Sequence, residues 1–152
     1  MKWRLLFGTL CIAALAACGS PGADTSFRPP SGWNSTPGIM GRFQMWMNND
    51  QIVMLIRGDK NTTFYNAQKS SPYATSMSDL KHSPIALCGG KQKADYFTGR
   101  GEGTTNGKHT VRAIEGIITD VGASRYVAMY IRPLNARADG QAEGALHSLC
   151  AK

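Results

Sequence analysis

The chain has 152 residues and a formal charge of +7, and 42% of its residues are hydrophobic. This length and hydrophobic share suit one domain with its own core. Seventeen glycines and seven prolines favour turns and strands over a helical bundle. The basic residues are scattered, and no helical stretch pairs a basic stripe with aromatic residues, so nucleic acid is not an expected partner.

The first 18 residues have the order of a secretory signal: two basic residues (Lys2 and Arg4), an apolar run from 5 to 14, and small residues before Cys18. A membrane span needs about 20 apolar residues, so this run is too short. Leu15-Ala16-Ala17-Cys18 resembles the lipobox of bacterial lipoproteins. That resemblance implies cleavage after Ala17, a diacylglycerol on the Cys18 thiol and an acyl chain such as palmitate on the new amine. The alternative is an ordinary signal peptide with a chance cysteine.

We therefore expect three segments: a cleaved signal peptide (1–17), a lipidated cysteine with a flexible tether (18–32), and a single domain (33–152). The tether is expected because 19–32 is small, polar and proline-rich. Cleavage would leave 135 residues and remove Lys2 and Arg4, so the charge falls to +5. The expected location is the cell envelope, anchored in a membrane and facing the periplasm or the cell exterior.

The first half of the domain predicts a hairpin and a helix. Residues 43–48 alternate in polarity, Asn49-Asp50 suits a turn, and 51–57 is rich in Ile, Val and Leu. A short strand is expected over 62–66. Ser71-Pro72 suits the start of a helix, and apolar residues then recur at helical spacing to about residue 81.

The second half predicts more strands and a closing helix. Strands are expected over 84–87, 95–98, 111–119 and 124–132, and the glycine-rich stretch 99–107 is expected to be a loop. Asn135 suits a helix N-cap, and Ala138, Ala142, Ala145 and Leu149 step at helical spacing. The predicted fold class is α+β, with a central antiparallel sheet and a short helix and a C-terminal helix packed on it.

This element order resembles the PsbP-like α/β/α sandwich, on the strength of Gly32-Trp33, the hairpin that follows and the closing helix. The chain is also similar to uncharacterised bacterial lipoproteins that pair a Cys-Gly-Gly segment with a terminal Leu-Cys, here 88–90 and 149–150. PsbP-like proteins mostly bind or assist other proteins. The resemblance therefore implies a binding role and supplies no catalytic residue.

Two cysteines remain in the expected domain, Cys88 and Cys150. An even pair in an oxidising compartment predicts a disulfide. The alternative is a reactive Cys88 thiol with His147 as its base, which would make the protein an envelope hydrolase.

No other motif predicts chemistry. The stretch 101–108 does not have the phosphate-loop spacing, because three or five residues rather than four separate the glycines and His109 follows the lysine. His82, His109 and His147 are far apart and lack the spacing of a zinc site. We therefore expect no catalytic residue, metal or cofactor.

The predicted function is a non-catalytic binding or accessory module for an envelope protein or another envelope component. Trp46 is a candidate contact because it lies in a methionine-rich hairpin that is either core or an adaptable binding surface. Lys91, Lys93 and Arg100 are candidates for contact with anionic partners or lipid. The rival function is a small-molecule or metal-binding accessory lipoprotein.

Overall fold

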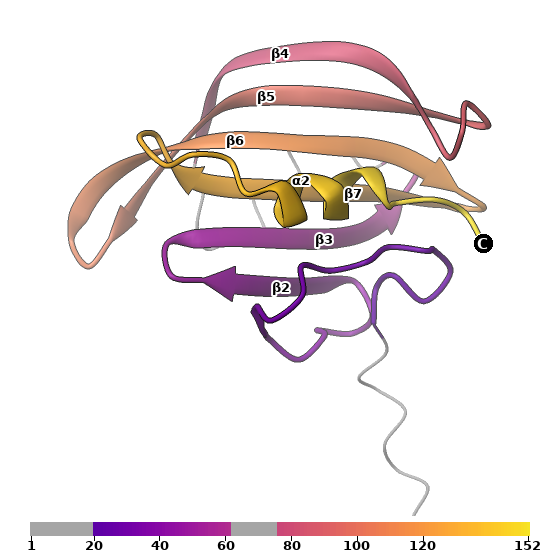
Figure 1. The fold of residues 1–152 in the computed structure, drawn as a ribbon, viewed down its shortest axis with the longest axis horizontal. Helices are drawn as coiled ribbons and strands as arrows, with labels where there is room; N and C mark the ends of the chain where they lie inside the picture. The colour runs from indigo at the N-terminus through magenta and orange to yellow at the C-terminus, as the bar shows by residue number, and fades with distance from the viewer. Residues whose placement is uncertain (1–19, 62–75) are drawn as a thin grey trace, which may run out of the picture.

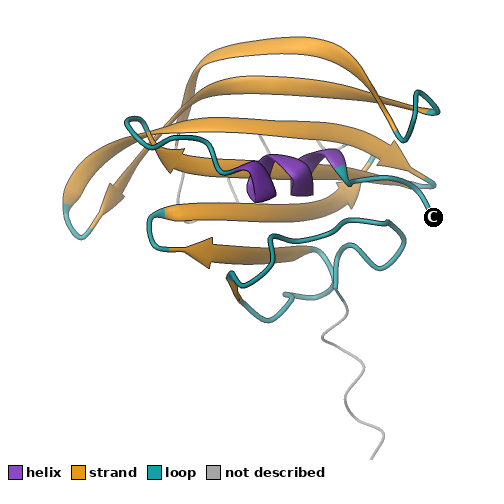
Figure 2. Ribbon diagram, in the orientation of Figure 1, coloured by secondary structure: helices purple, strands orange, loops and turns teal. Residues whose placement is uncertain are grey.

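The computed structural model describes residues 20–61 and 76–152, and a single antiparallel sheet dominates them (Figures 1 and 2). The sheet has seven strands in the order β1-β2-β3-β7-β6-β5-β4. The strands are β1 (Asn34–Ser35), β2 (Phe43–Asn48), β3 (Gln51–Asp59), β4 (Ser76–Leu87), β5 (Gln92–Thr105), β6 (Lys108–Val121) and β7 (Ser124–Pro133). One helix of the described residues, α2 (Gly140–His147), lies across β7 and β6 on one face (Figure 1).

The expected α+β class is therefore wrong, because the described chain is mostly β with one short helix. The helix expected to reach residue 81 is absent over 76–81, where β4 pairs with β5 instead. Residues 62–75, with the strand expected at 62–66 and the start of that helix, lie outside the described residues. The expected PsbP-like sandwich is therefore wrong as well, because one sheet with one covering helix is not a sandwich with several helices.

The glycine-rich stretch 99–107 is not a loop either. β5 runs through to Thr105, and only Asn106 and Gly107 form the turn to β6. Both residues have positive φ, 51° and 73°, as a two-residue hairpin turn requires. The glycine at 99 is needed for packing, because a Cβ there would lie 2.8 Å from Leu80 Cδ2 and 3.0 Å from the carbonyl oxygen of Ser78. That close approach occurs at the register shift between Ser78 and Lys81.

The other predicted elements are confirmed with changed ends. The first hairpin pairs Asn48 with Gln51 around Asn49 and Asp50, as predicted, and β6 and β7 extend the two later strands. The closing helix begins at Gly140 rather than beside Asn135. Its N-cap is Asp139, whose side chain accepts hydrogen bonds from the backbone N–H groups of Gln141 and Ala142.

Alternation along the strands builds two apolar clusters, one on each face of the sheet. The face under α2 buries Trp46, Val53, Leu55, Leu87, Ile117, Tyr126, Ala128 and Tyr130 with Ala142, Ala145, Leu146 and Leu149. The other face buries Met45, Ile52, Met54, Ile56, Phe97, Ile114, Val127, Met129 and Ile131. Both faces of the central strands are therefore core, and most of the methionine-rich hairpin belongs to it.

Residues 20–32 pack on the domain rather than extending from it as the expected flexible tether. Pro21 is fully buried, and the N–H of Ser26 donates to the carbonyl oxygen of Cys150 at 2.8 Å. The ring of Phe27 lies 5.4 Å from that of Trp46. This segment thus completes the cover of the α2 face.

The predicted disulfide is present between Cys88 and Cys150, with Cα atoms 5.9 Å apart. It joins the residue after β4 to the residues that follow α2, across a sequence separation of 62. The same region is tied to the N-terminal segment by the bridge between Thr25 and Ala151. The first described residues and the last ones therefore meet at one end of the sheet.

Candidate functional site

One end of the sheet gathers segments from the whole described chain. We call it the basal end, and it is formed by residues 20–25, 36–42, 58–61, 88–91, 121–124 and 150–152. In Figure 1 it lies on the right, where the C-terminus is marked. The opposite end, which we call the distal end, carries the β2–β3 and β5–β6 turns.

Basic side chains outnumber carboxylates at and beside the basal end. The cations are Arg42, Arg57, Lys60, Lys91, Lys93, Arg125 and Lys152, and the carboxylates are Asp24, Asp59, Asp95 and Asp120. Two pairs neutralise part of this charge: Arg57 Nη2 lies 3.1 Å from Asp24 Oδ2, and Arg125 Nε lies 2.8 Å from Asp120 Oδ1. The remaining excess is positive and exposed, which suits an anionic surface.

Lys91, in the turn before β5, and Lys93, near the start of β5, are an exposed part of this charge. Neither lysine is among the ion pairs of the described residues. They border a shallow depression of about 480 Å³, which also reaches Ile118, Asp120 and Arg125 on the neighbouring strands. Asp95 also lines the depression, and Arg125 is bonded to Asp120, so the two lysine ammonium groups are the cations left to attract an anionic group such as a phosphate.

The structure does not bring the four predicted contact residues together. Trp46 is only 6% exposed and packs against Phe27, so its ring offers no surface to a partner. Arg100 lies further along β5 and pairs with Asp79, Nε to Oδ2, at 3.5 Å. Of the four residues, only Lys91 lies at the basal end, and Lys93 lies beside it.

A buried polar cluster under α2 was not predicted. Tyr96 Oη donates a hydrogen bond to Glu115 Oε2 at 2.7 Å, and Glu115 is only 9% exposed. Its other oxygen, Oε1, is buried without a hydrogen-bond partner among the described residues, as is Nε of Arg132. The sequence signal was a glutamate inside the apolar run 113–118, which indicates a buried carboxylate that needs a donor.

The protonation of this cluster favours a structural role. Burial, followed by the hydrogen bond to Glu115, raises the pKa of Tyr96 to about 12. The phenol therefore stays protonated at neutral pH and serves as a donor to the carboxylate. The ring of His147 stacks on Tyr96 at 6.4 Å between centroids, which limits access to the phenol.

The hydrolase alternative loses its nucleophile, because the sulfur of Cys88 is bonded to that of Cys150. The three histidines have different neighbours. His82 Nδ1 lies 2.5 Å from Asp95 Oδ2, His109 Nε2 lies 3.5 Å from Glu102 Oε2, and the ring of His147 lies against Tyr96. In the described part of the chain, no group of three or more His, Cys, Asp or Glu side chains is placed to hold a metal ion. Residues 103–108 form the β5–β6 hairpin, not a loop before a helix, so they do not make a phosphate loop.

The comparisons with known proteins add no relative: neither a family model nor a curated protein matches the chain. Within residues 20–61 and 76–152, no helix has the length and hydropathy to cross a bilayer.

Proposed function

We propose that this protein is a lipoprotein of the cell envelope, anchored through Cys18, with a domain that binds rather than catalyses. The observation that carries the proposal is the position of the first packed residues. Ser20 Oγ donates to Gln44 Oε1 at 3.2 Å and Pro21 is buried, so the folded domain begins two residues after the lipobox cysteine.

Such a short connection holds the domain at the lipid surface. Consecutive Cα atoms are 3.8 Å apart, so the Cα of Cys18 lies at most about 8 Å from that of Ser20. An acylated Cys18 would therefore place the basal end beside the headgroups. The positive excess at that end suits the anionic lipids of an envelope membrane. The bound component is then the membrane surface, with any protein partner reached from the rest of the domain.

The test is the dependence of membrane attachment on Cys18. The full precursor is expressed in a bacterium that processes lipoproteins, and detergent-phase partitioning and the mass of the N-terminal peptide are measured. Wild type is expected to enter the detergent phase and carry a diacylglycerol on Cys18, because two or more acyl chains give stable anchoring. Cys18→Ser is expected to remain unprocessed or to enter the aqueous phase.

The matched control is Cys11→Ser, which removes a leader cysteine that follows Leu10 rather than a small residue. This variant should partition as wild type does. Normal cleavage and detergent partitioning of Cys18→Ser would overturn the proposed anchor.

A further inference from the structure

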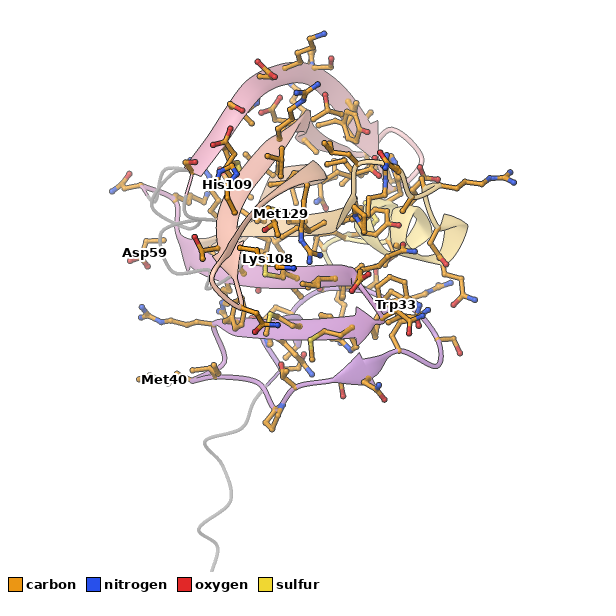
Figure 3. All side chains as sticks on the ribbon, turned by 90° about the vertical axis from the view of Figure 1, so that its left-hand side faces the viewer. Trp33, Met40, Asp59, Lys108, His109 and Met129 are labelled. Carbon is orange, nitrogen blue, oxygen red and sulfur yellow. A yellow bond between two sulfur atoms is a disulfide. The ribbon has the colours of Figure 1, made fainter. Side chains whose placement is uncertain are left out.

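Two neighbouring apolar side chains protrude at the basal end. Ile39 is 57% exposed and Met40 is 82% exposed, the highest values among the large hydrophobic residues of the described chain. Figure 3 shows Met40 projecting away from the body of the molecule. Isolated exposed apolar residues are ordinary, but two in sequence at a loop tip are a common mark of an interaction site.

The loop is a small hairpin with a defined shape. At its base, the N–H of Thr36 donates to the carbonyl oxygen of Met45 at 2.9 Å. Nearer the tip, the N–H of Ile39 donates to the carbonyl oxygen of Phe43 at 2.8 Å. These hydrogen bonds hold Met40 and Gly41 at the turn, so the apolar tip is presented by the fold and not by a loose segment.

The backbone at the tip is also unfavourable for the residue it carries. Met40 has a φ of 50°, in the left-handed region where Gly and Asn are favoured and other side chains are strained. A strained and exposed methionine stabilises neither the turn nor the core. Such outliers often mark positions kept for function.

The base of this hairpin is where the described chain begins. Ser20 contacts Gln44, and Nε2 of Gln44 donates to the carbonyl oxygen of Thr36 at 3.2 Å. Thr36 and Gln44 are the two sides of the hairpin base. The exposed Arg42 lies next to the tip, so a cation accompanies the two apolar side chains.

We propose that the Ile39–Met40 tip inserts into the headgroup region of the membrane that holds Cys18, and so fixes the orientation of the domain. This inference rests on the proposed lipid anchor. The side chains of Ile39 and Met40 would enter the boundary between headgroups and acyl chains, while Arg42 stays at the phosphates. The distal end, with its two hairpin turns, then faces away from the membrane.

The experiment measures the depth of single positions in the lipidated protein. Mature lipoprotein is reconstituted into vesicles of phosphatidylethanolamine and phosphatidylglycerol. Met40→Cys is labelled with a fluorophore that reports polarity, and Lys108→Cys at the distal end is the matched control. Cys18 is blocked by lipid, and Cys88 and Cys150 are bonded, so only the new thiol reacts.

The label at position 40 is expected to shift to shorter emission wavelength and to be quenched at least severalfold more by lipid-borne quenchers than the label at 108. Ile39→Cys is a second probe of the same tip, and unchanged unfolding midpoints exclude a folding defect. Equal, weak quenching at 39, 40 and 108 would overturn the inference while leaving the anchor intact. Membrane attachment that does not need Cys18 would overturn both.

Discussion

Tyr96 shows how a single buried pair links stability to pH. The phenol of an unfolded chain titrates near pH 10, whereas burial and Glu115 raise the pKa of Tyr96 in the folded protein to about 12. Burial also raises the pKa of Tyr126 and of Tyr130. Below pH 10 the phenol is protonated in both states, so its contribution to folding is complete. As the pH rises from 10 through 12, the unfolded chain loses the proton first, and the contribution is lost.

We therefore predict that Tyr96→Phe is less stable than wild type at neutral pH but loses less stability between pH 10 and 12. The neutral-pH loss should be about 1–3 kcal/mol, because the buried Glu115 carboxylate would lose its donor. Urea unfolding at pH 8, 10, 11 and 12 measures both effects. Glu115→Gln is the control that keeps an acceptor but removes the charge. Parallel curves for wild type and Tyr96→Phe across this pH range would contradict the prediction.

Some features of single residues could be predicted from the sequence, and others could not. The Cys88–Cys150 pairing was predictable because two cysteines remained once Cys11 was assigned to the leader and Cys18 to the lipobox. The burial of Trp46 was not, because alternation places Trp46 and Met45 on opposite faces and both faces are covered. Residue spacing identifies the two faces of a strand, but only the tertiary structure shows which of them is buried.

At the scale of elements, local patterns predicted the regular hairpins and missed the irregular strands. Asn49-Asp50 lies between two apolar runs, and the turn predicted there is confirmed between β2 and β3. The apolar spacing of Met77 and Leu80 suited a helix, yet pairing with β5 determined the conformation of 76–81. Asn106-Gly107 is typical of a hairpin turn. The strand before it was missed because the glycines at 99, 101 and 103 made the stretch resemble a loop. Glycine is depleted in strands in general, so its packing role at 99 could not be read locally.

Two glycines in different elements give a matched prediction. A Cβ at Gly116 in β6 would lie 2.3 Å from Cζ of Phe97 and 2.6 Å from the carbonyl oxygen of Ala128. A Cβ at the exposed Gly144 in α2 would meet no atom within 4 Å. We expect Gly116→Ala to lower the free energy of unfolding by about 1–3 kcal/mol through overpacking.

Gly144→Ala, in contrast, should raise that free energy by up to about 1 kcal/mol, because alanine has the higher helix propensity. Chemical denaturation of the two variants beside wild type measures both changes. The same change of residue therefore has opposite signs in the sheet core and on the helix surface. A Gly116→Ala protein as stable as wild type would mean that Phe97 can move away without loss.

On the scale of the whole molecule, the sheet separates a basal end from a distal end along the strand direction. The disulfide, the Thr25–Ala151 bridge and the packed segment 20–32 all lie at or run into the basal end. Over 20–32 the expected flexible tether is not seen, because this proline-rich segment buries Pro21 and packs the ring of Phe27 at a tilt against that of Trp46. The composition of segment 20–32 suits a linker. The segment packs because β2 and β3 offer it an apolar surface, which includes Trp46 and Leu55. The distance between membrane and domain is therefore short in the proposed arrangement.

The excess of basic residues at and beside the basal end should attract the domain to anionic membranes. Mature protein carrying Cys18→Ser lacks the lipid, so its weak association with anionic vesicles reports the surface charge alone. We expect this association to weaken as salt is raised, because screening reduces attraction between exposed charges. A basic residue close to an anionic membrane contributes about 1 kcal/mol. Reversing two of them, Lys91→Glu with Lys93→Glu, should weaken binding by at least about 30-fold.

The control is Arg100→Glu, which reverses a basic residue on β5, the strand that carries Lys93. Arg100 lies away from the basal end and is paired with Asp79, so its reversal should change vesicle binding much less than the double variant does. Sedimentation with phosphatidylglycerol vesicles at low and high salt measures both variants, and neutral vesicles give the background. The double variant changes the charge by four units and Arg100→Glu by two. If Arg100→Glu cost half as much binding free energy as the double reversal, the attraction would depend on net charge, and the basal end would have no special part in it.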